Sequence, residues 1–396
     1  ADPAFRKLIL AICAGGPRFA RELGRQPLLL DLISSEPEGL GFPADLSSAA
    51  TGDIAGFKSR YELMAGVRHL LGFTDFDTLT EEISAVAARV VSASWAALGR
   101  GGKKPLPPLA VFALGKFGTQ ELGLDADIDL LFVAGDAGDG ARPVQERLAA
   151  RILAGVTASS AGEGLYEADV RLRPEGKSAP LVVEAASYAK YIATRASLWE
   201  RQSLTRLRFV EGDRTVGAYV SALVSSWVYE TPLPEAWGAK IVAMRRAMET
   251  RIRSRTAGRL DLKLGSGGMA DIEFIVQMLQ LKFGGSNPGL RWGKVCAMLK
   301  KAPLPPGLPG DPAFLASAYG MYRRLEFLMR AGLEERGWVL PSGDKLARLA
   351  RLYDGSSGAA LSSRLAATMK RVRKEFLDIA AFLEQAEPPG AGGHPR

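Results

Sequence analysis

Two aspartates placed two residues apart carry the chemistry that this sequence suggests. Asp127 and Asp129 belong to a strand-like run that ends at Val133. Because side chains alternate between the two faces of a strand, both carboxylates point to one side while Ile128 and Leu130 point to the other. Their spacing along the strand is roughly 7 Å, and convergence on one ligand at about 4 Å would cost on the order of 4 kcal/mol in a protein-like dielectric. A divalent cation such as Mg²⁺ or Mn²⁺ removes that cost, so the pair predicts a metal site.

A buried strand and a glycine turn precede these aspartates. The run from Leu109 to Leu114 contains only apolar residues, which predicts a strand covered on both faces. Gly115 and Gly118 then permit a tight turn around Lys116. The backbone N–H groups of this turn and the ammonium of Lys116 are candidates to bind phosphates beside the metal. An isolated Asp-x-Asp would ordinarily be an acidic strand edge facing solvent, but the adjoining turn favours a functional site.

A second strand-like run, Leu165 to Leu172, supplies the third candidate carboxylate. Its two-residue period places Asp169 on one face together with Glu167, Arg171 and Arg173. Two-metal phosphoryl transfer uses a further carboxylate as a bridging ligand or base, and Asp169 is a candidate for this role, although the residues alone favour a structural pairing with Arg171 or Arg173. The two arginines would clamp phosphate oxygens. Structural salt bridges between these arginines and Asp169 are the alternative.

Composition restricts the classes of function. The chain has 396 residues, of which 47% are hydrophobic and 24% charged, and this predicts an ordinary globular protein with two or three domains. With only His69 and His394, a hydrolase that activates serine or cysteine through histidine lacks a base. The net charge of +8 is spread along the chain without a basic stripe carrying interleaved aromatics, which argues against a nucleic-acid partner.

The cysteines and the hydropathy indicate the compartment. Cys13 and Cys296 lie far apart in sequence, so neither a disulfide framework nor a cysteine metal site is expected. No apolar run has the length of a membrane span, and the N-terminus lacks a signal-peptide layout. We therefore expect a reducing, cytoplasmic location. Because the sequence does not begin with Met, we also expect a fragment of a longer chain.

Helical and strand periodicity predict three regions and a disordered tail at residues 386–396. The N-terminal helical region, 1–100, has predicted helices at Phe5–Ala14, Pro17–Gly24, Pro27–Ile33, Gly56–Leu71 and Thr78–Leu98, with a loop at Ser34–Asp53. After a glycine and lysine hinge at 99–105, the nucleotide-binding region, 101–235, adds a helix at Ala141–Ala158, a strand at Pro180–Glu184 and a long helix at Ala186–Phe209. The last region, 236–385, is a predicted helical bundle with helices that include Phe314–Glu335, Lys345–Tyr353 and Leu361–Glu384.

A glycine-rich loop in this last region is a further candidate for phosphate binding. It runs from Lys263 to Gly268, and Ser266 is predicted to cap a helix that starts near Gly267. Asp271 and Glu273 fall in the first turns of that helix. They either complement the helix dipole or contact a nucleotide or metal, and the sequence leaves both roles open.

Taken together, these motifs resemble the DNA-polymerase-β-type nucleotidyltransferases, in the form carried by the glutamine synthetase adenylyltransferase and adenylyl-removase family. The matching segments are Gly115-Lys116, Glu121-Leu122-Gly123, Asp127 to Leu130, Leu165 to Pro174, Trp199-Glu200-Arg201, Arg206 to Arg208, Gly212-Asp213, Asp261 to Gly268 and Asp271 to Phe274. The resemblance covers nearly the whole chain. Thr119 and Ala179 stand where the family usually has glycines, and neither change removes a carboxylate.

The resemblance implies an α+β fold, in which a small mixed-sheet polymerase-β-type nucleotidyltransferase core is flanked by N-terminal helices and a C-terminal helical bundle. It implies a metal-dependent transfer of AMP between ATP and a tyrosine hydroxyl of glutamine synthetase, or the reverse phosphorolytic removal, in the regulation of nitrogen assimilation. By the same resemblance, Asp127, Asp129 and Asp169 would hold Mg²⁺ or Mn²⁺, and Asp169 would activate the acceptor oxygen. The predicted nucleotide-binding residues are Gly115, Lys116, Gly118, Arg171 and Arg173.

The implied protein substrate is glutamine synthetase, with a PII-type signalling protein as a further candidate partner. The family pairs an attaching and a removing half on one chain. Tyr166 to Asp169 and Asp261 to Lys263 look like the attaching half, which we favour, whereas Lys263 to Gly268 resembles the removing half. Two alternatives stay open: the same chemistry on RNA or a small molecule, and a non-catalytic module that senses a nucleotide or a nitrogen-signalling protein. Three converging carboxylates argue against the non-catalytic module.

Overall fold

The computed structural model describes residues 3–25, 53–99, 106–138, 140–160, 163–256 and 258–385. The chain divides into two compact units, residues 1–227 and 228–396. The predicted helix at 27–33 and the predicted tail at 386–396 lie outside the described residues. The same is true of all but one end residue of the loop at 34–53 and of the hinge at 99–105.

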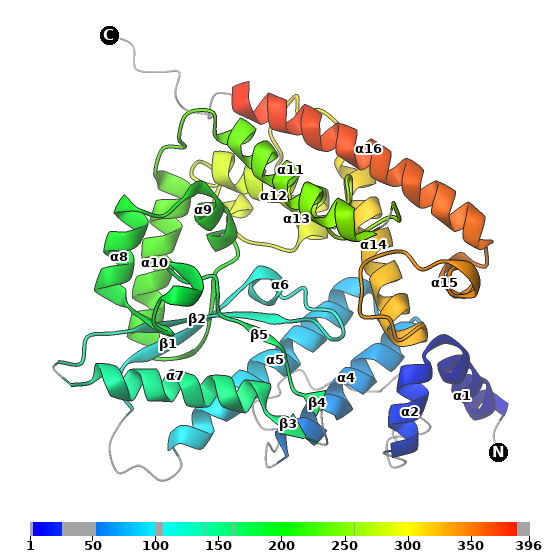
Figure 1. Ribbon diagram of the computed structural model, residues 1–396, viewed down its shortest axis with the longest axis horizontal. Helices are drawn as coiled ribbons and strands as arrows, with labels where there is room; N and C mark the ends of the chain where they lie inside the picture. The colour runs from blue at the N-terminus through cyan, green and yellow to red at the C-terminus, as the bar shows by residue number, and fades with distance from the viewer. Residues whose placement is uncertain are drawn as a thin grey trace. The chain divides into compact units, whose positions relative to one another are not determined.

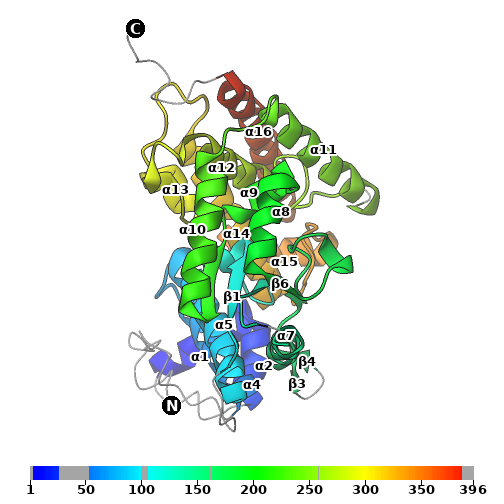
Figure 2. The ribbon, with the colours of Figure 1, turned by 90° about the vertical axis from the view of Figure 1, so that its left-hand side faces the viewer.

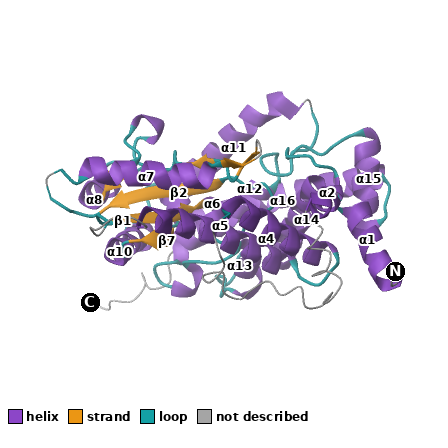
Figure 3. Cartoon of the chain, turned by 90° about the horizontal axis from the view of Figure 1, so that it is seen from below, coloured by secondary structure: helices purple, strands orange, loops and turns teal. Residues whose placement is uncertain are grey.

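A mixed sheet forms the centre of the first unit (Figure 3). The strands β1 (Leu109–Leu114) and β2 (Ile128–Ala134) pair antiparallel. On the far side of β1, β7 (Arg208–Gly212) pairs antiparallel, whereas β5 (Ala168–Asp169) and β6 (Val182–Glu184) both pair parallel with the other edge of β2. All residues of β1 are buried, which confirms the strand predicted to be covered on both faces.

The helices of the first unit agree with most of the predicted ones. They are α1 (Pro3–Gly15), α2 (Pro17–Arg25), α4 (Ile54–Leu70), α5 (Phe76–Gly99), α7 (Arg142–Thr157), α8 (Ala185–Thr194), α9 (Leu198–Leu204) and α10 (Arg214–Glu230). A small ribbon of β3 (Ser159–Ser160) and β4 (Glu163–Gly164) follows α7. Helix α5 packs against α4, α7 and β7 (Figure 1). The N-terminal helices therefore share one core with the sheet.

The prediction of a single long helix from Ala186 to Phe209 is wrong. The chain instead forms α8, α9 and the strand β7. The hydroxyl of Ser197 and the carboxylate of Glu200 make a capping box, which starts a new helix at that point. Beyond α9, Phe209 pairs with Phe112 in the sheet, and their rings meet edge to face at 5.8 Å. Burial of this aromatic pair favours a strand over continued helix.

The strand predicted from Leu165 to Leu172 is much shorter, because only Ala168 and Asp169 pair with β2. The carboxylate of Asp169 accepts a hydrogen bond of 2.8 Å from the backbone N–H of Arg171. That bond turns the chain and takes a donor that a longer ladder would use.

The second unit is a bundle of helices, as predicted. Its helices are α11 (Trp237–Thr256), α12 (Met269–Phe283), α13 (Val295–Lys301), α14 (Pro312–Gly332), α15 (Gly343–Asp354) and α16 (Gly358–Gln385). Helices α11 and α12 both pack against α16 (Figure 2). A small mixed sheet and a two-stranded ribbon among many helices agree with the predicted α+β class. Within the described ranges, no helix combines the length and the apolar character that crossing a membrane requires.

The glycine-rich loop before α12 is closed by its own hydrogen bonds. Gly268 N–H donates to Gly265 at 2.9 Å, and Gly267 N–H donates to the Asp271 carboxylate at 2.8 Å. The next three N–H groups, those of Met269, Ala270 and Asp271, donate to the carbonyls of Leu262, Lys263 and Gly268. The predicted Ser266 cap is wrong, since Gly268 is the N-cap residue and no side chain caps this helix. No N–H group from Gly267 to Asp271 is left over for a phosphate.

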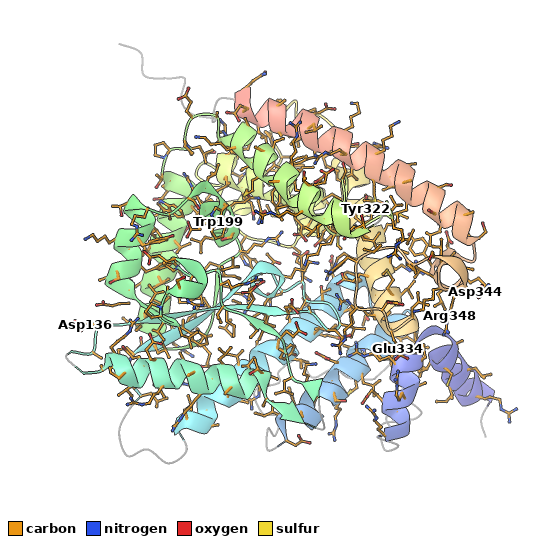
Figure 4. The ribbon with its side chains drawn as sticks, viewed as in Figure 1. Asp136, Trp199, Tyr322, Glu334, Asp344 and Arg348 are labelled. Atoms are coloured by element: carbon orange, nitrogen blue, oxygen red, sulfur yellow. The ribbon has the colours of Figure 1, made fainter. Side chains whose placement is uncertain are left out.

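Asp271 is the anchor of a buried ion network within this unit. Its Oδ1 lies 2.6 Å from Nε of Arg245, and both side chains are fully buried. Arg373 reaches the same carboxylate at 3.1 Å and also bonds Glu249 at 2.9 Å. Burial raises the pKa of Asp271, and the charges of Arg245 and Arg373 oppose this effect by lowering it. The open question about Asp271 is thus answered by a structural role. Tyr322 of α14, labelled in Figure 4, donates a further hydrogen bond of 2.8 Å to Gly267 O in the same loop.

We predict that Gly267→Ala strongly destabilises the second unit. Gly267 has φ +73°, and an added Cβ would overlap the carbonyl of Met369 in α16. Both effects act together, so the free energy of unfolding should fall by on the order of 3 kcal/mol or more. The matched control is Gly355→Ala, at φ +77° with open space around it, which should cost only about 1–2 kcal/mol. Urea unfolding followed by circular dichroism measures both, and equal losses would contradict the importance of the contact with α16.

Candidate active site

The turn after β1 is built so that a carboxylate can lie against it. Leu114, the last residue of β1, pairs with Asp129 of β2. The next residue, Gly115, has φ +55°, and a Cβ there would overlap Oδ2 of Asp129. Gly115 to Gly118 form the short helix α6, in which Gly118 packs on the carbonyl of Arg206 so closely that no side chain fits. Both glycines predicted for this turn are therefore required by close approach.

The pairing of β2 with β5 brings the third carboxylate to the first two. Asp129 is the register partner of Asp169 in this parallel pair, and the strands of such a pair lie about 4.8 Å apart. The N–H of Ile128 donates to Glu167 O at 2.9 Å, which extends the register by one residue. Asp127 directly precedes β2 and is exposed, whereas Asp129 is half-buried. The structure thus gathers all three predicted aspartates at one edge of the sheet.

A pocket of about 530 Å³ opens at this edge. Its volume falls in the range of small-molecule sites. It is lined by Asp127, Glu167, Ala168, Asp169, Val170, Arg171 and Arg173. Five of these seven side chains are charged, so the pocket suits a polar, charged ligand.

Arg171 is the cation that balances these carboxylates. Its Nε lies 2.9 and 2.8 Å from the two carboxylate oxygens of Asp169. The hydrogen bond to Asp169 and the charge of that residue raise the pKa of Arg171, and the charges of Asp129 and Asp127 add to the rise. One guanidinium therefore interacts with all three aspartates. Since 61% of its side chain is exposed, Arg171 can exchange this bond for a ligand at little cost.

Arg173 has a different environment, although the sequence placed it beside Arg171. It is buried and donates to the carbonyl oxygens of Val170 and Ala179, the latter at 3.0 Å. These bonds close the loop that leads from β5 to β6. Ala179 contributes only its backbone carbonyl to this contact, so its departure from the family pattern leaves the bond in place.

Asp127 and Asp129 fit a divalent cation in number and chemistry. Mg²⁺ typically takes one or two protein carboxylates and completes its shell with water and phosphate oxygens. Within the part of the chain that the structure describes, no three His, Cys, Asp or Glu side chains converge as metal ligands. Asp169 is engaged by Arg171 instead. A two-carboxylate site is therefore what the present arrangement supports.

The loop that delivers Asp127 is braced from the N-terminal helices. Arg18 of α2 forms an ion pair with Asp125, which adopts φ +52°, and the hydroxyl of Ser84 in α5 accepts from Leu122 N–H at 3.1 Å. Thr119, the other departure from the family pattern, donates its hydroxyl to Glu121 at 2.7 Å. Sequence reasoning missed these braces, because they join positions up to 107 residues apart.

Two family models match parts of this chain. The family described as glutamate-ammonia ligase adenylyltransferase matches residues 49–222, and the family described as GlnD PII-uridylyltransferase matches residues 239–380. The first match contains Asp127, Asp129 and Asp169, and the second covers most of the helical unit.

Three similar proteins are each named bifunctional glutamine synthetase adenylyltransferase/adenylyl-removing enzyme. The protein of Methylococcus capsulatus is 34% identical over 70% of this chain, and that of Mycobacterium bovis is 34% identical over 77%. The protein of Mesorhizobium japonicum is 29% identical over 95% of this chain. The chain spans 33%, 32% and 41% of the lengths of these three proteins, respectively. By the family match and these relatives, the chain belongs to the glutamine synthetase adenylyltransferase/adenylyl-removing enzyme family.

Proposed function

We propose that this chain transfers AMP between ATP and a tyrosine hydroxyl of glutamine synthetase. The observation that carries the proposal is the parallel pairing of Asp129 with Asp169 directly beside the Gly115–Gly118 turn. The names of the relatives support glutamine synthetase as the protein acceptor. A strand, a glycine turn and an aspartate strand in one mixed sheet also lead us to propose a polymerase-β-type core for the first unit.

In the proposed attachment, the tyrosine oxygen attacks the α-phosphorus of ATP. A bond forms between these two atoms, the bond from the α-phosphorus to the bridging oxygen of the β-phosphate breaks, and pyrophosphate leaves. Asp169 takes the phenolic proton, while Lys116 and Arg171 hold phosphate oxygens. A cation held by Asp127 and Asp129 would supply charge stabilisation of the triphosphate. Removal would run by attack of orthophosphate on the same phosphorus, which releases ADP and the tyrosine.

The partners are assigned by the same proposal. Recognition of a large protein requires roughly 800 Å² of surface on each partner, far more than the pocket at the aspartates provides. We assign this recognition to helical surfaces outside the pocket, with glutamine synthetase as the substrate. The similarity of residues 239–380 to a PII-uridylyltransferase family supports a PII-type protein as a further partner of the second unit. Attachment is the favoured direction.

Loss of either metal-binding carboxylate should abolish most of the transfer. We predict that Asp127→Asn and Asp129→Asn each reduce AMP transfer by about a hundredfold or more, because each removes charge that stabilises the transition state. The assay incubates α-labelled ATP, Mg²⁺ and glutamine synthetase, and the reverse assay adds orthophosphate to adenylylated enzyme. Asp136→Asn, in the exposed loop after β2 (Figure 4), is the control and should stay within about twofold.

Circular dichroism of each variant shows whether the fold is retained. Wild-type turnover in both aspartate variants would exclude the proposed roles. Labelling of RNA or of a small molecule in place of glutamine synthetase would favour the alternative acceptors instead.

Nucleotide affinity should depend on both the cation and Lys116. We predict that ATP binds at least about tenfold more tightly with Mg²⁺ than with chelator present, since the triphosphate and two aspartates repel each other without it. Lys116→Ala should weaken binding by a similar factor, whereas Lys190→Ala, an exposed lysine of α8, should not. Calorimetric titration measures each value. Equal affinities with and without the cation would count against a metal-bridged triphosphate.

The two arginines of the pocket should separate in their effects. Arg171→Ala is expected to weaken ATP binding with little loss of stability, because its side chain is mostly exposed. Arg173→Ala is expected to lower the free energy of unfolding by about 1–3 kcal/mol, because two half-buried carbonyls lose their donor. Thermal unfolding and ATP titration of both variants distinguish these roles. The reverse pattern would mean that Arg173 is the phosphate ligand.

A further inference from the structure

Arg208 of β7 reaches across the sheet to the turn that carries Lys116. Ala113 of β1 is its register partner, so its side chain starts beside the last residues of β1. Its Nε donates to Gly118 O at 3.0 Å, and its Nη2 donates to Phe117 O at 2.9 Å. The guanidinium also lies 5.3 Å from the centre of the Phe117 ring. Three contacts thus join one side chain to one four-residue helix.

The two carbonyls that Arg208 binds are those that a helix end leaves without intrahelical partners. Within the turn itself, the backbone N–H groups of Thr119, Glu121 and Gln120 donate to Gly115 O, Lys116 O and Phe117 O, and the first and last of these bonds are long, at 3.4 Å. A helix of four residues is too short to gain the further hydrogen bonds that stabilise a longer helix once its first turn has formed. The Arg208 guanidinium, which donates two hydrogen bonds at the C-terminal end of α6, therefore contributes much of the stability of this turn.

The charge of Arg208 is not neutralised by an acid. Among the described residues no carboxylate forms an ion pair with it, and its hydrogen bonds go only to the two carbonyls. Burial lowers its pKa to about 10, so it remains protonated at neutral pH. A partly buried cation without a counter-charge lowers the stability of the fold. Such a residue is expected at positions that are selected for function and not for stability.

We propose that Arg208 is a positioning residue: by clamping the carbonyls of Phe117 and Gly118, it holds the Gly115–Gly118 turn and thereby Lys116 in the geometry that meets the triphosphate. The role of Lys116 rests on the proposed function, whereas the clamp on the turn does not. Gly118 supports the same inference from the other side, since its Cα packs directly on the carbonyl of Arg206, two residues before Arg208. Residues 206–208, which lead into β7, thus contact the turn through one backbone carbonyl and one side chain.

Hydrogen exchange on the full chain tests the clamp without reference to activity. In Arg208→Gln, the amide protection factors of Thr119, Gln120 and Glu121 should fall at least about tenfold, while those of β1 and β2 stay unchanged. Arg208→Lys keeps the charge but cannot donate to both carbonyls in the same geometry, so its protection factors should lie between those of wild type and Arg208→Gln. If Arg208→Gln does not fold, Arg208→Lys provides the test. Arg195→Gln, an exposed arginine of the same unit, is the control and should change nothing in the turn. Unchanged exchange of these three amides in both Arg208 variants would overturn the proposal.

A double-mutant cycle on ATP affinity tests whether the clamp acts through Lys116. We expect about a tenfold loss for Lys116→Ala, about tenfold for Arg208→Gln, and still about tenfold for the double variant, because the second change removes nothing further. A hundredfold loss in the double variant would show that Arg208 acts independently, and would overturn the positioning role. If wild type does not bind ATP at all, the proposed function fails, and the exchange experiment alone decides whether Arg208 holds the turn.

Discussion

Parallel pairing between β2 and β5 holds Asp129 beside Asp169, and the proposed chemistry depends on that register. A slip of one residue would turn Asp169 to the opposite face of the sheet. Only two residues of β5 pair with β2, so the ladder by itself is weak. The register is reinforced by the bond from Ile128 N–H to Glu167 O and by the bonds from Arg173 that close the following loop. Elements that contact no ligand thus determine where the third carboxylate lies.

Charge balance explains why this edge of the sheet needs support from distant parts of the unit. Three aspartates repel one another, and Arg171 compensates them from a mostly exposed position. Because the Arg171 side chain is mostly exposed, its guanidinium can give way to phosphate or metal. This suits a site that must bind and release a charged ligand. The rigid supports lie one layer further out, where Arg18 pairs with Asp125 and Arg208 clamps the turn.

Two glycine-rich loops of similar composition perform different tasks in this chain. In the first, Gly115 allows the carboxylate of Asp129 to approach the backbone. In the second, Gly267 allows the backbone of α16 to approach at Met369, and the N–H groups that could have held a phosphate are taken by carbonyls and by Asp271. Glycine content alone does not separate a ligand site from a packing site, because both need a missing Cβ. The group that approaches the glycine separates them: a carboxylate in the first loop and backbone in the second.

The sequence by itself determined the elements whose signal is local: the apolar strand at Leu109–Leu114, the strand that carries Asp129, and the long amphipathic helices of both units. It also singled out the three aspartates that the structure places at one edge of the sheet, because their spacing and flanking residues form a recognisable motif. It failed where local and tertiary preferences compete, as in the stretch that became α8, α9 and β7, whose strand exists only because β1 offers it an edge. Tertiary structure alone decided that Arg173 and Asp271 are buried in structural bonds, that Arg171 balances the aspartates, and that Arg208 reaches the turn. Each of these depends on contacts between residues far apart in the chain, and one-dimensional spacing carries no information on which buried carbonyl or carboxylate a given arginine will meet.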